Sequence, residues 1–337
     1  METWDPQAHR AQRRRSVLLQ RYLFAPLTYG LFWPGIQLMR ALGQEEALAR
    51  KLVAGPIGQF REQMAAAFTQ YTPTAHDVVV CSYFKSGTNW AMQIAYQVAH
   101  LGNGEFEHIH DVVAWPDAPD PQVAVALPDP RPLEQSPTKL RVIKTHSLAS
   151  QVPHNEQAKY ICVVRDPKDV FVSSYFFFRS VMFGHLMPSV ETWLALFLSE
   201  QAFYAEWAAF TADYWPWREQ DNVLFLSFGE MKRDLAGTVA RIAALMGVAL
   251  TDEQTAEVIR RSSFSYMKGI DHKFYPGMVS PFGFKEGSMM RKGKRGDASE
   301  LLSKEQEARM DGYMKQALQE LGSDFPYEAY FGEGAIG

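Results

Sequence analysis

The chain has 337 residues, of which 47% are hydrophobic, and a formal net charge of -4. That length fits one large α/β domain or two small ones, and the slightly acidic balance argues against a protein that holds nucleic acid by general electrostatics. The two cysteines, Cys81 and Cys162, lie in apolar runs, so we expect buried thiols rather than a disulfide or a metal pair. No Asn-x-Ser/Thr site occurs, and we expect a cytoplasmic protein.

Residues 1–70 are expected to form a partly helical arm that precedes a main domain at residues 71–337. Three consecutive arginines, ending at Arg15, come before a segment rich in Leu, Phe, Tyr and Trp over residues 17–39. Charged and helix-breaking residues such as Pro34 leave an apolar run too short to span a bilayer. Two interpretations stay open: an arm packed on the domain or on a second subunit of a homo-oligomer, or a basic, aromatic segment lying on a membrane surface.

An apolar strand, a polar turn and an amphipathic helix follow one another over residues 78–102. The short continuous apolar run that ends at Cys81 is typical of a strand buried on both faces. The turn is Lys85-Ser86-Gly87-Thr88, and apolar residues at helical spacing continue to Gly102, where a glycine would cap the helix. A helix N-terminus attracts anions and a glycine allows close approach, so the pattern predicts a phosphate-binding loop. Because the lysine precedes the only glycine, a plain turn with a surface lysine is the alternative.

The middle of the chain is rich in proline. Seven of the 19 prolines lie between residues 111 and 139, which excludes a long helix or a central strand there. We interpret this segment as a wall or lid of the substrate site. His108 and His110 precede it without further ligands at a recognisable spacing, which favours a loop over a metal site.

Two further strands are predicted to end in charged residues. The first, over residues 140–146, brings Lys144 and His146 to its carboxyl end, where open parallel sheets bind ligands and where an imidazole can act as a general base. The second covers residues 160–164 and precedes Arg165, whose planar fork suits a phosphate.

A helix is predicted directly after Arg165. Asp166 suits its N-cap, Pro167 its first position and Asp169 a capping box, and Ser173 lies about two turns further on. The strand-to-helix change therefore predicts a second anion site.

The last third repeats the strand-helix pattern. A strand over residues 223–228 is followed by a helix that ends at Gly247, and a capping box at Thr251 opens another helix. Four basic residues occur among residues 291–295, and the glycines between them favour a loop that wraps an anion over a solvated charge run.

Together these segments resemble the cytosolic-type sulfotransferases, which use 3′-phosphoadenosine 5′-phosphosulfate (PAPS). Residues 83–90 are similar to their 5′-phosphosulfate loop, Lys144-Thr145-His146 to their catalytic Lys-Thr-His, and residues 163–175 to their 3′-phosphate segment, in the same order. Residues 262–264 resemble their adenine-contacting Thr-Ser-Phe, and residues 291–296 their Arg-Lys-Gly-x-x-Gly motif. The resemblance covers residues 78 to the end. It implies a single α/β domain with a central parallel sheet flanked by helices, in a P-loop-like PAPS-binding fold.

The resemblance also implies roles for individual residues. His146 would be the base, Lys85 would stabilise the leaving phosphate oxygen and Lys144 the sulfuryl oxygens, with Ser173 as a further catalytic residue. No metal is used in the family. PAPS, or its product adenosine 3′,5′-bisphosphate (PAP), would be held by Lys85, Ser86, Gly87, Thr88, Asn89, Trp90, Arg165, Ser173, Phe228, Ser262, Phe264, Arg291, Lys292 and Gly293.

Some positions depart from the family. Phe228 replaces a common tyrosine, Asn89 the usual second threonine and Ala298 a common tryptophan, and none of these changes removes a catalytic group. The dimerisation pattern is not recognisable, so the oligomeric state stays open.

The acceptor is expected to be a hydrophobic alcohol, phenol or lipid, with an amine as the weaker option. Aromatic residues cluster at residues 176–183, 193–197 and 274–284, although most of the helical ones are expected in the core. An ATP-dependent phosphotransferase of small molecules and a catalytically silent nucleotide-binding module remain as alternatives.

Overall fold

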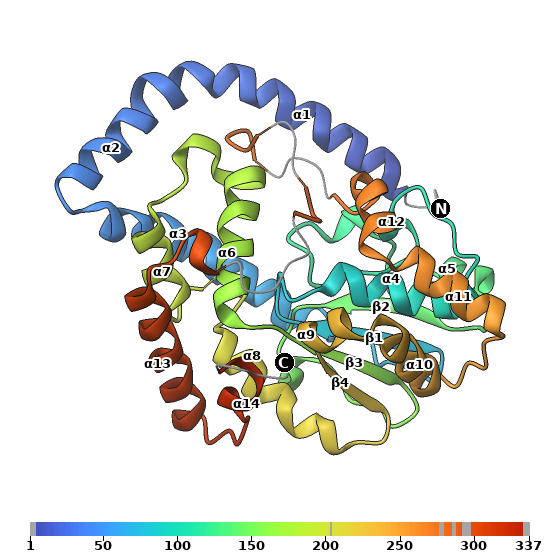
Figure 1. Ribbon diagram of the computed structural model, residues 1–337. Helices are drawn as coiled ribbons and strands as arrows, with labels where there is room; N and C mark the ends of the chain where they lie inside the picture. Colours follow the sequence, from blue (N-terminus) through green and yellow to red (C-terminus); the bar gives the residue numbers. More distant parts are fainter. Residues whose placement is uncertain (1–4, 203, 276–279, 285–287, 292–297, 333–337) are drawn as a thin grey trace.

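The computed structural model describes residues 5–202, 204–275, 280–284, 288–291 and 298–332 (Figure 1). Its centre is a parallel four-stranded sheet in the order β2-β1-β3-β4. The strands are β1 (Asp77–Ser82), β2 (Arg141–Thr145), β3 (Lys159–Val164) and β4 (Val223–Ser227). Helices cover the sheet, and this arrangement confirms the predicted α/β fold.

The strand register brings three strand ends to one edge of the sheet. β1 lies between β2 and β3, and Cys81 pairs with Thr145 on one side and with Cys162 on the other. The chain passes from β1 to β2 on one side and then to β3 on the opposite side, which makes the carboxyl edge of these strands a topological switch point. The residues that follow the three strands therefore meet at one place.

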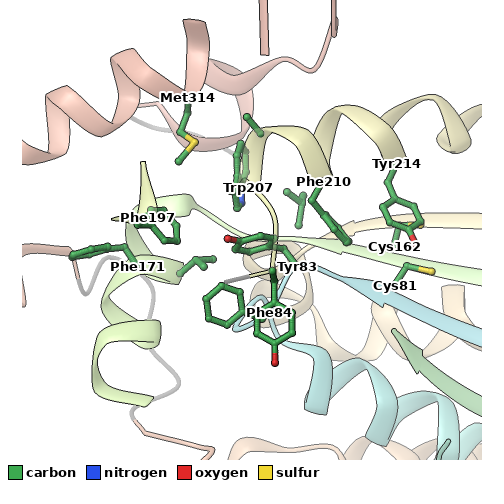
Figure 2. Packing of buried hydrophobic residues seen from close by; sticks show 14 of the residues in the cluster. Cys81, Tyr83, Phe84, Cys162, Phe171, Phe197, Trp207, Phe210, Tyr214 and Met314 are labelled. Carbon is green, nitrogen blue, oxygen red and sulfur yellow. The ribbon is translucent and has the colours of Figure 1, made fainter. Parts of the chain in front are cut away.

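Strand residues alternate between two hydrophobic cores, as expected for a parallel sheet covered on both faces. Val79 and Cys81 belong to the first core, and Val78 and Val80 to the second. Figure 2 shows part of the first core around the two buried cysteines. Helices that pack there are α3 (Glu45–Ala66), α6 (Pro167–Phe178), α7 (Val190–Phe197), α8 (Trp207–Tyr214), α13 (Lys304–Glu320) and α14 (Tyr327–Phe331). Those in the second core are α4 (Thr88–Ala99), α9 (Phe228–Arg233), α10 (Leu235–Met246), α11 (Asp252–Arg261) and α12 (Phe264–Gly269).

The N-terminal arm is helical over most of its length. Its first part is α1 (Pro6–Leu27), a π-helical turn (Thr28–Phe32) and α2 (Trp33–Ala41), which together arch across one side of the molecule (Figure 1). The rest of the expected arm of residues 1–70 is mainly α3, which packs in the first core, so we keep the name arm for residues 6–44. Pro26 lies inside α1 without ending it, and a π-helical turn begins two residues later. Among the described residues, no helix is both long enough and apolar enough to cross a bilayer.

Several predicted helix ends are confirmed and one is displaced. Asp166 caps α6, Gly247 (φ +68°) ends α10, and Thr251 opens α11 with a capping box. α4 ends at Ala99, three residues before Gly102. Leu101 takes the left-handed position at its C-terminus, and the Gly102 N–H donates to the Gln97 carbonyl at 2.8 Å.

The proline-rich segment carries only short helical pieces, as predicted. They are 3-10 turns at Ile109–Asp111 and Pro121–Val123, and α5 (Arg131–Gln135).

Candidate active site

The turn after β1 presents an uncapped helix N-terminus to the cavity. Lys85 (φ +64°) and Gly87 (φ +100°) both have left-handed backbone conformations. A Cβ on Gly87 would lie 2.8 Å from the Phe228 ring, so only glycine fits this position. The Ser82 and Thr88 hydroxyls lie 2.6 Å apart and tie the end of β1 to the start of α4. No side chain caps α4, and although the Trp90 N–H already donates to the Gly87 carbonyl at 2.9 Å, the Thr88 and Asn89 N–H groups are available donors for an anion.

Lys85 is half-buried among aromatic and cationic groups. Its Nζ lies 4.3 Å from the centroid of the Phe177 ring. Burial, together with the charges of Arg165 and Arg291, lowers the pKa of Lys85 to about 8. In the described part of the chain neither Lys85 nor Lys144 forms an ion pair, so a bound anion would be the counter-charge that restores their ordinary basicity.

His146 has the tautomer that a general base requires. Its Nδ1 lies 2.7 Å from the Ser82 carbonyl oxygen. Because a carbonyl only accepts, Nδ1 carries the proton and Nε2 is left with a lone pair. Burial and the nearby charge of Lys144 hold the pKa of His146 well below its usual value, so the ring is neutral at physiological pH.

Asp117 supports this histidine, and the sequence did not single it out among the acids of the proline-rich segment. Its carboxylate accepts the backbone N–H of His146 at 2.6 Å. Burial raises the pKa of Asp117 and lowers that of Lys144, while each charge favours the ionised form of the other. Lys144 Nζ also lies 3.3 Å from the centroid of the Trp115 ring. The proline-rich segment thus contributes Trp115 to the cavity wall, as expected, and also the Asp117 carboxylate, which is fully buried and does not line the cavity.

Arg165 connects the turn after β3 to the turn after β1. Its Nη1 donates to the Lys85 carbonyl at 3.1 Å, and its Nη2 lies 3.4 Å from the Asp169 carboxylate. The guanidinium also stacks 4.3 Å from the centroid of Phe228. Ser173, which lies on α6, lines the same cavity.

Arg291 is the part of the predicted 3′-phosphate loop that the structure describes. It lines the cavity, pairs with Glu300 and lies 4.6 Å from the centroid of Phe176. Lys292 and Gly293, which were predicted to bind the same phosphate, lie outside the described residues.

Aromatic side chains form the third side of the cavity. The Trp90 indole donates to the Ser262 carbonyl at 2.8 Å, and its ring meets Phe228 edge-on at 5.6 Å. Phe264 is 44% exposed and lines the cavity with Trp90. Ser86 and Ser262, predicted as binding residues, are fully buried beside it and do not line it.

One cavity of about 440 Å³ joins these groups. Of the predicted residues, it is lined by Lys85, Gly87, Thr88, Asn89, Trp90, Lys144, His146, Arg165, Ser173, Phe228, Phe264 and Arg291. Around His146 the wall is aromatic, with the rings of Trp115 and Tyr204 at 5.8 and 5.0 Å from the imidazole. Phe84 and Phe177 continue this wall. Tyr204 lies in a loop with no motif, so the sequence carried no signal for it.

Comparisons with known proteins agree with this geometry. Residues 75–322 match the model of the sulfotransferase domain family. The chain is 29% identical to sulfotransferase 2A1 of Macaca fascicularis over 283 residues, which are 82% of this chain and 96% of that protein. It is 26% identical to sulfotransferase 1C2 of Rattus norvegicus over 265 residues, covering 72% and 83% of the two chains.

Solved structures show the same fold. A crystal structure of retinol dehydratase in complex with androsterone and inactive cofactor PAP aligns with a TM-score of 0.61 at 21% identity, covering 79% of this chain and 87% of that one. A mouse sulfotransferase complexed with PAP aligns with a TM-score of 0.57 at 21% identity, covering 77% and 89%.

Proposed function

The chain belongs to the sulfotransferase domain family, and from this premise we propose that it transfers a sulfuryl group from PAPS to a hydroxyl group of a hydrophobic small molecule or lipid. An amine is the alternative acceptor group. The observation that carries the proposal is the meeting of a neutral His146, the buried Lys144, the half-buried Lys85 and an uncapped helix N-terminus in one cavity.

The residues of the cavity fit a donor that carries two phosphate groups. Lys85 and the N–H groups at the start of α4 would hold the 5′-phosphosulfate, in a turn where a Cβ at position 87 would clash with the Phe228 ring. Arg165, Ser173 and Arg291 would hold the 3′-phosphate, and Trp90 and Phe264 would flank adenine. Bound there, PAPS supplies the sulfuryl group and PAP is the product that leaves.

The chain's own residues then divide the work of the transfer. His146 Nε2 accepts the proton of the acceptor hydroxyl as the oxygen attacks sulfur. Lys144 stabilises the negative charge on the sulfuryl oxygens, and Lys85 stabilises the charge that develops on the leaving phosphate oxygen. Holding the acceptor and donor in line on opposite sides of the sulfur supplies the remaining rate enhancement.

The aromatic wall around His146 supports a hydrophobic acceptor. Trp115, Tyr204, Phe84 and Phe177 are apolar at the side where an acceptor hydroxyl would reach Nε2. The solved structures of retinol dehydratase contain androsterone or retinol, which are hydrophobic alcohols. A polysaccharide would need an open, polar cleft in place of this wall.

Calorimetric titration tests the proposal without knowledge of the acceptor. The protein is titrated with PAP, ADP and ATP, each with and without Mg²⁺. We expect metal-independent binding of PAP in the micromolar range, and much weaker binding of ADP, which lacks the 3′-phosphate. Lys85→Ala should lose most of the PAP affinity, and Lys51→Ala, at an exposed lysine outside the cavity, should keep it.

Other outcomes would point elsewhere. A preference for Mg-ATP would indicate a phosphotransferase instead. PAP binding without turnover in an acceptor screen with PAPS would indicate a silent nucleotide-binding module.

A further inference from the structure

The exposed apolar surface of this protein is concentrated on the N-terminal arm. Eleven of the fourteen large hydrophobic side chains that are exposed among the described residues lie between Leu19 and Leu42. Leu19, Tyr22 and Leu23 are 63%, 77% and 67% exposed. Single exposed hydrophobic residues are normal, whereas a contiguous set usually marks an interaction surface.

The arm has two faces, and the inner face is already packed on the domain. Val17 and Thr28 are buried, and Phe24 and Phe32 contact the ring of Phe282 at 6.2 and 6.1 Å. At the start of α1, Arg10 pairs with Asp111. The inner face therefore holds the arm against the domain, and the outer face remains exposed.

The outer face is a helical stripe. Leu19, Tyr22, Leu23 and Leu27 follow the i, i+3, i+4, i+8 spacing of one side of α1, and all four are exposed. Beyond α1 the exposed set continues with Leu31, Trp33, Leu38 and Leu42, whereas Tyr29 and Phe32 are only partly free because their rings contact His185 and Phe282. We call Leu19, Tyr22, Leu23, Leu27, Leu31, Trp33, Leu38 and Leu42 the outer stripe.

The charge beside the outer stripe is positive overall, because Arg10, Arg13 and Arg40 pair with acidic residues whereas Arg14, Arg15 and Arg21 form no ion pair among the described residues. Residues 6–44 contain six arginines and no aspartate or glutamate, in a chain whose formal net charge is -4. Arg14 and Arg15 are exposed, and Arg15 lies one turn before Leu19 on the same side of α1. Such a helix, with arginines beside Leu, Tyr and Trp, is suited to lie in the interface of an anionic bilayer.

We propose that the outer stripe docks on an anionic lipid surface, with α1 and α2 lying in the plane of the interface. A second copy of the chain fits this face less well, because two-fold pairing would bring together segments whose uncompensated charges, those of Arg14, Arg15 and Arg21, are all positive. Lipid headgroups provide the opposite charge, and the acyl boundary accepts the apolar side chains. This inference does not depend on the reaction that the cavity catalyses.

Vesicle co-sedimentation tests the docking. The full chain is mixed with phosphatidylcholine vesicles with and without phosphatidylserine, and the bound fraction is measured at low and high salt. We expect binding to the phosphatidylserine vesicles that weakens with salt. The variant Leu19→Gln/Leu23→Gln/Leu27→Gln should bind at least about tenfold more weakly. The matched control Leu321→Gln changes a leucine that is 52% exposed outside the arm and should bind like the wild type.

The charge contribution is tested separately. Arg14→Gln/Arg15→Gln should weaken binding to the phosphatidylserine vesicles by roughly fivefold for each arginine. Lys51→Gln, which removes an exposed cation outside the outer stripe, is the control. Because all these side chains are on the surface, melting temperatures should stay close to that of the wild type.

Three results would overturn the proposal. Wild-type protein that sediments equally with and without phosphatidylserine would refute the charge complementarity, and leucine variants that bind like the wild type would refute the surface. If light scattering showed a dimer that the leucine variant dissolves, with no vesicle binding, the outer stripe would be an interface between copies.

Discussion

The turns that follow β1 and β3 share a strand-to-helix plan, but they treat the helix N-terminus in opposite ways. After β3, the Asp166 carboxylate accepts the Lys168 N–H at 2.9 Å, and Asp169 lies 3.4 Å from Arg165. After β1, the N-cap is Gly87 and no side chain takes the place of the carboxylate. The turn after β3 therefore satisfies its helix N-terminus and its arginine with its own carboxylates, whereas the turn after β1 leaves backbone N–H donors for a ligand.

This contrast indicates where the chemistry and the anchoring occur. In the turn after β1, Lys85 and the first residues of α4 line the cavity. The imidazole of His146 is held at the end of β1, because its Nδ1 donates to the Ser82 carbonyl. In the turn after β3, Arg165 lies beside the Asp169 carboxylate, so a ligand phosphate would share the guanidinium with that carboxylate and this turn would add affinity and position. We expect substitutions near the first turn to lower turnover most.

The largest effect is expected for His146→Ala. Removing a positioned general base should lower turnover by about 10² to 10⁴, with PAP affinity little changed, since the imidazole contacts the acceptor side of the cavity. Initial rates with PAPS and a hydrophobic alcohol, together with PAP titration, separate the two quantities. His76→Ala changes an exposed histidine that bonds to the Lys139 carbonyl and serves as the control. Near-normal turnover in His146→Ala would remove the base from the proposal.

The next effect is expected for Gly87→Ala, which tests the first turn directly. The new Cβ would meet Phe228 at 2.8 Å, and φ is +100°, so the variant should lose about 1–3 kcal/mol of stability and at least about tenfold in PAP affinity. Gly247→Ala has a similar left-handed strain (φ +68°) but open space around it, so it should lose stability without losing PAP affinity. Equal PAP affinity in the two variants would contradict a special role for the first turn.

Much of this arrangement was readable from the sequence because it is local. Short apolar runs predicted all four strands, and parallel strands with ends at one edge bring Lys85, His146 and Arg165 together. Asp117 was not predicted because its bond to His146 spans 29 residues of chain and leaves no local spacing.

Orientation was less predictable than position. A motif places Ser86 and Ser262 near the site, yet both side chains are fully buried and do not line the cavity. The helix-breaking residues of the arm argued only against a bilayer-spanning run, and the structure continues α1 past Pro26 into a π turn. Which side of a turn faces a ligand depends on tertiary packing, which the spacing of residues does not record.

A smaller effect concerns the protonation of Lys85. Its pKa of about 8 is lowered by burial, and a bound phosphate raises that pKa. PAP binding therefore favours the protonated lysine: affinity is full below about pH 8 and falls as pH rises above it, by up to about tenfold per pH unit until the bound-state pKa is reached.

Calorimetry from about pH 7 to about pH 9.5 measures this decline, and buffers of different ionisation enthalpy report the accompanying proton uptake. Lys85→Arg keeps its charge over this range, so the affinity of this variant should fall less with pH than that of the wild type, and the remaining slope belongs to Lys144, whose pKa burial lowers to about 7. A wild-type profile no steeper than that of Lys85→Arg would mean that Lys85 does not touch the phosphate.

The smallest effect is expected at the second turn, for Asp166→Ala. Loss of the N-cap of α6 should cost about 1 kcal/mol of stability, as should Thr251→Ala at the N-cap of α11, away from the cavity. The Asp166 carboxylate caps the N-terminus of α6 and is not among the residues proposed to contact PAP. PAP affinity should therefore change by no more than about twofold in either variant. Thermal melting and PAP titration of the two variants give both numbers. An order-of-magnitude loss of PAP affinity in Asp166→Ala alone would show that the capped turn organises the ligand as strongly as the uncapped one, and the contrast between the two turns would then fail.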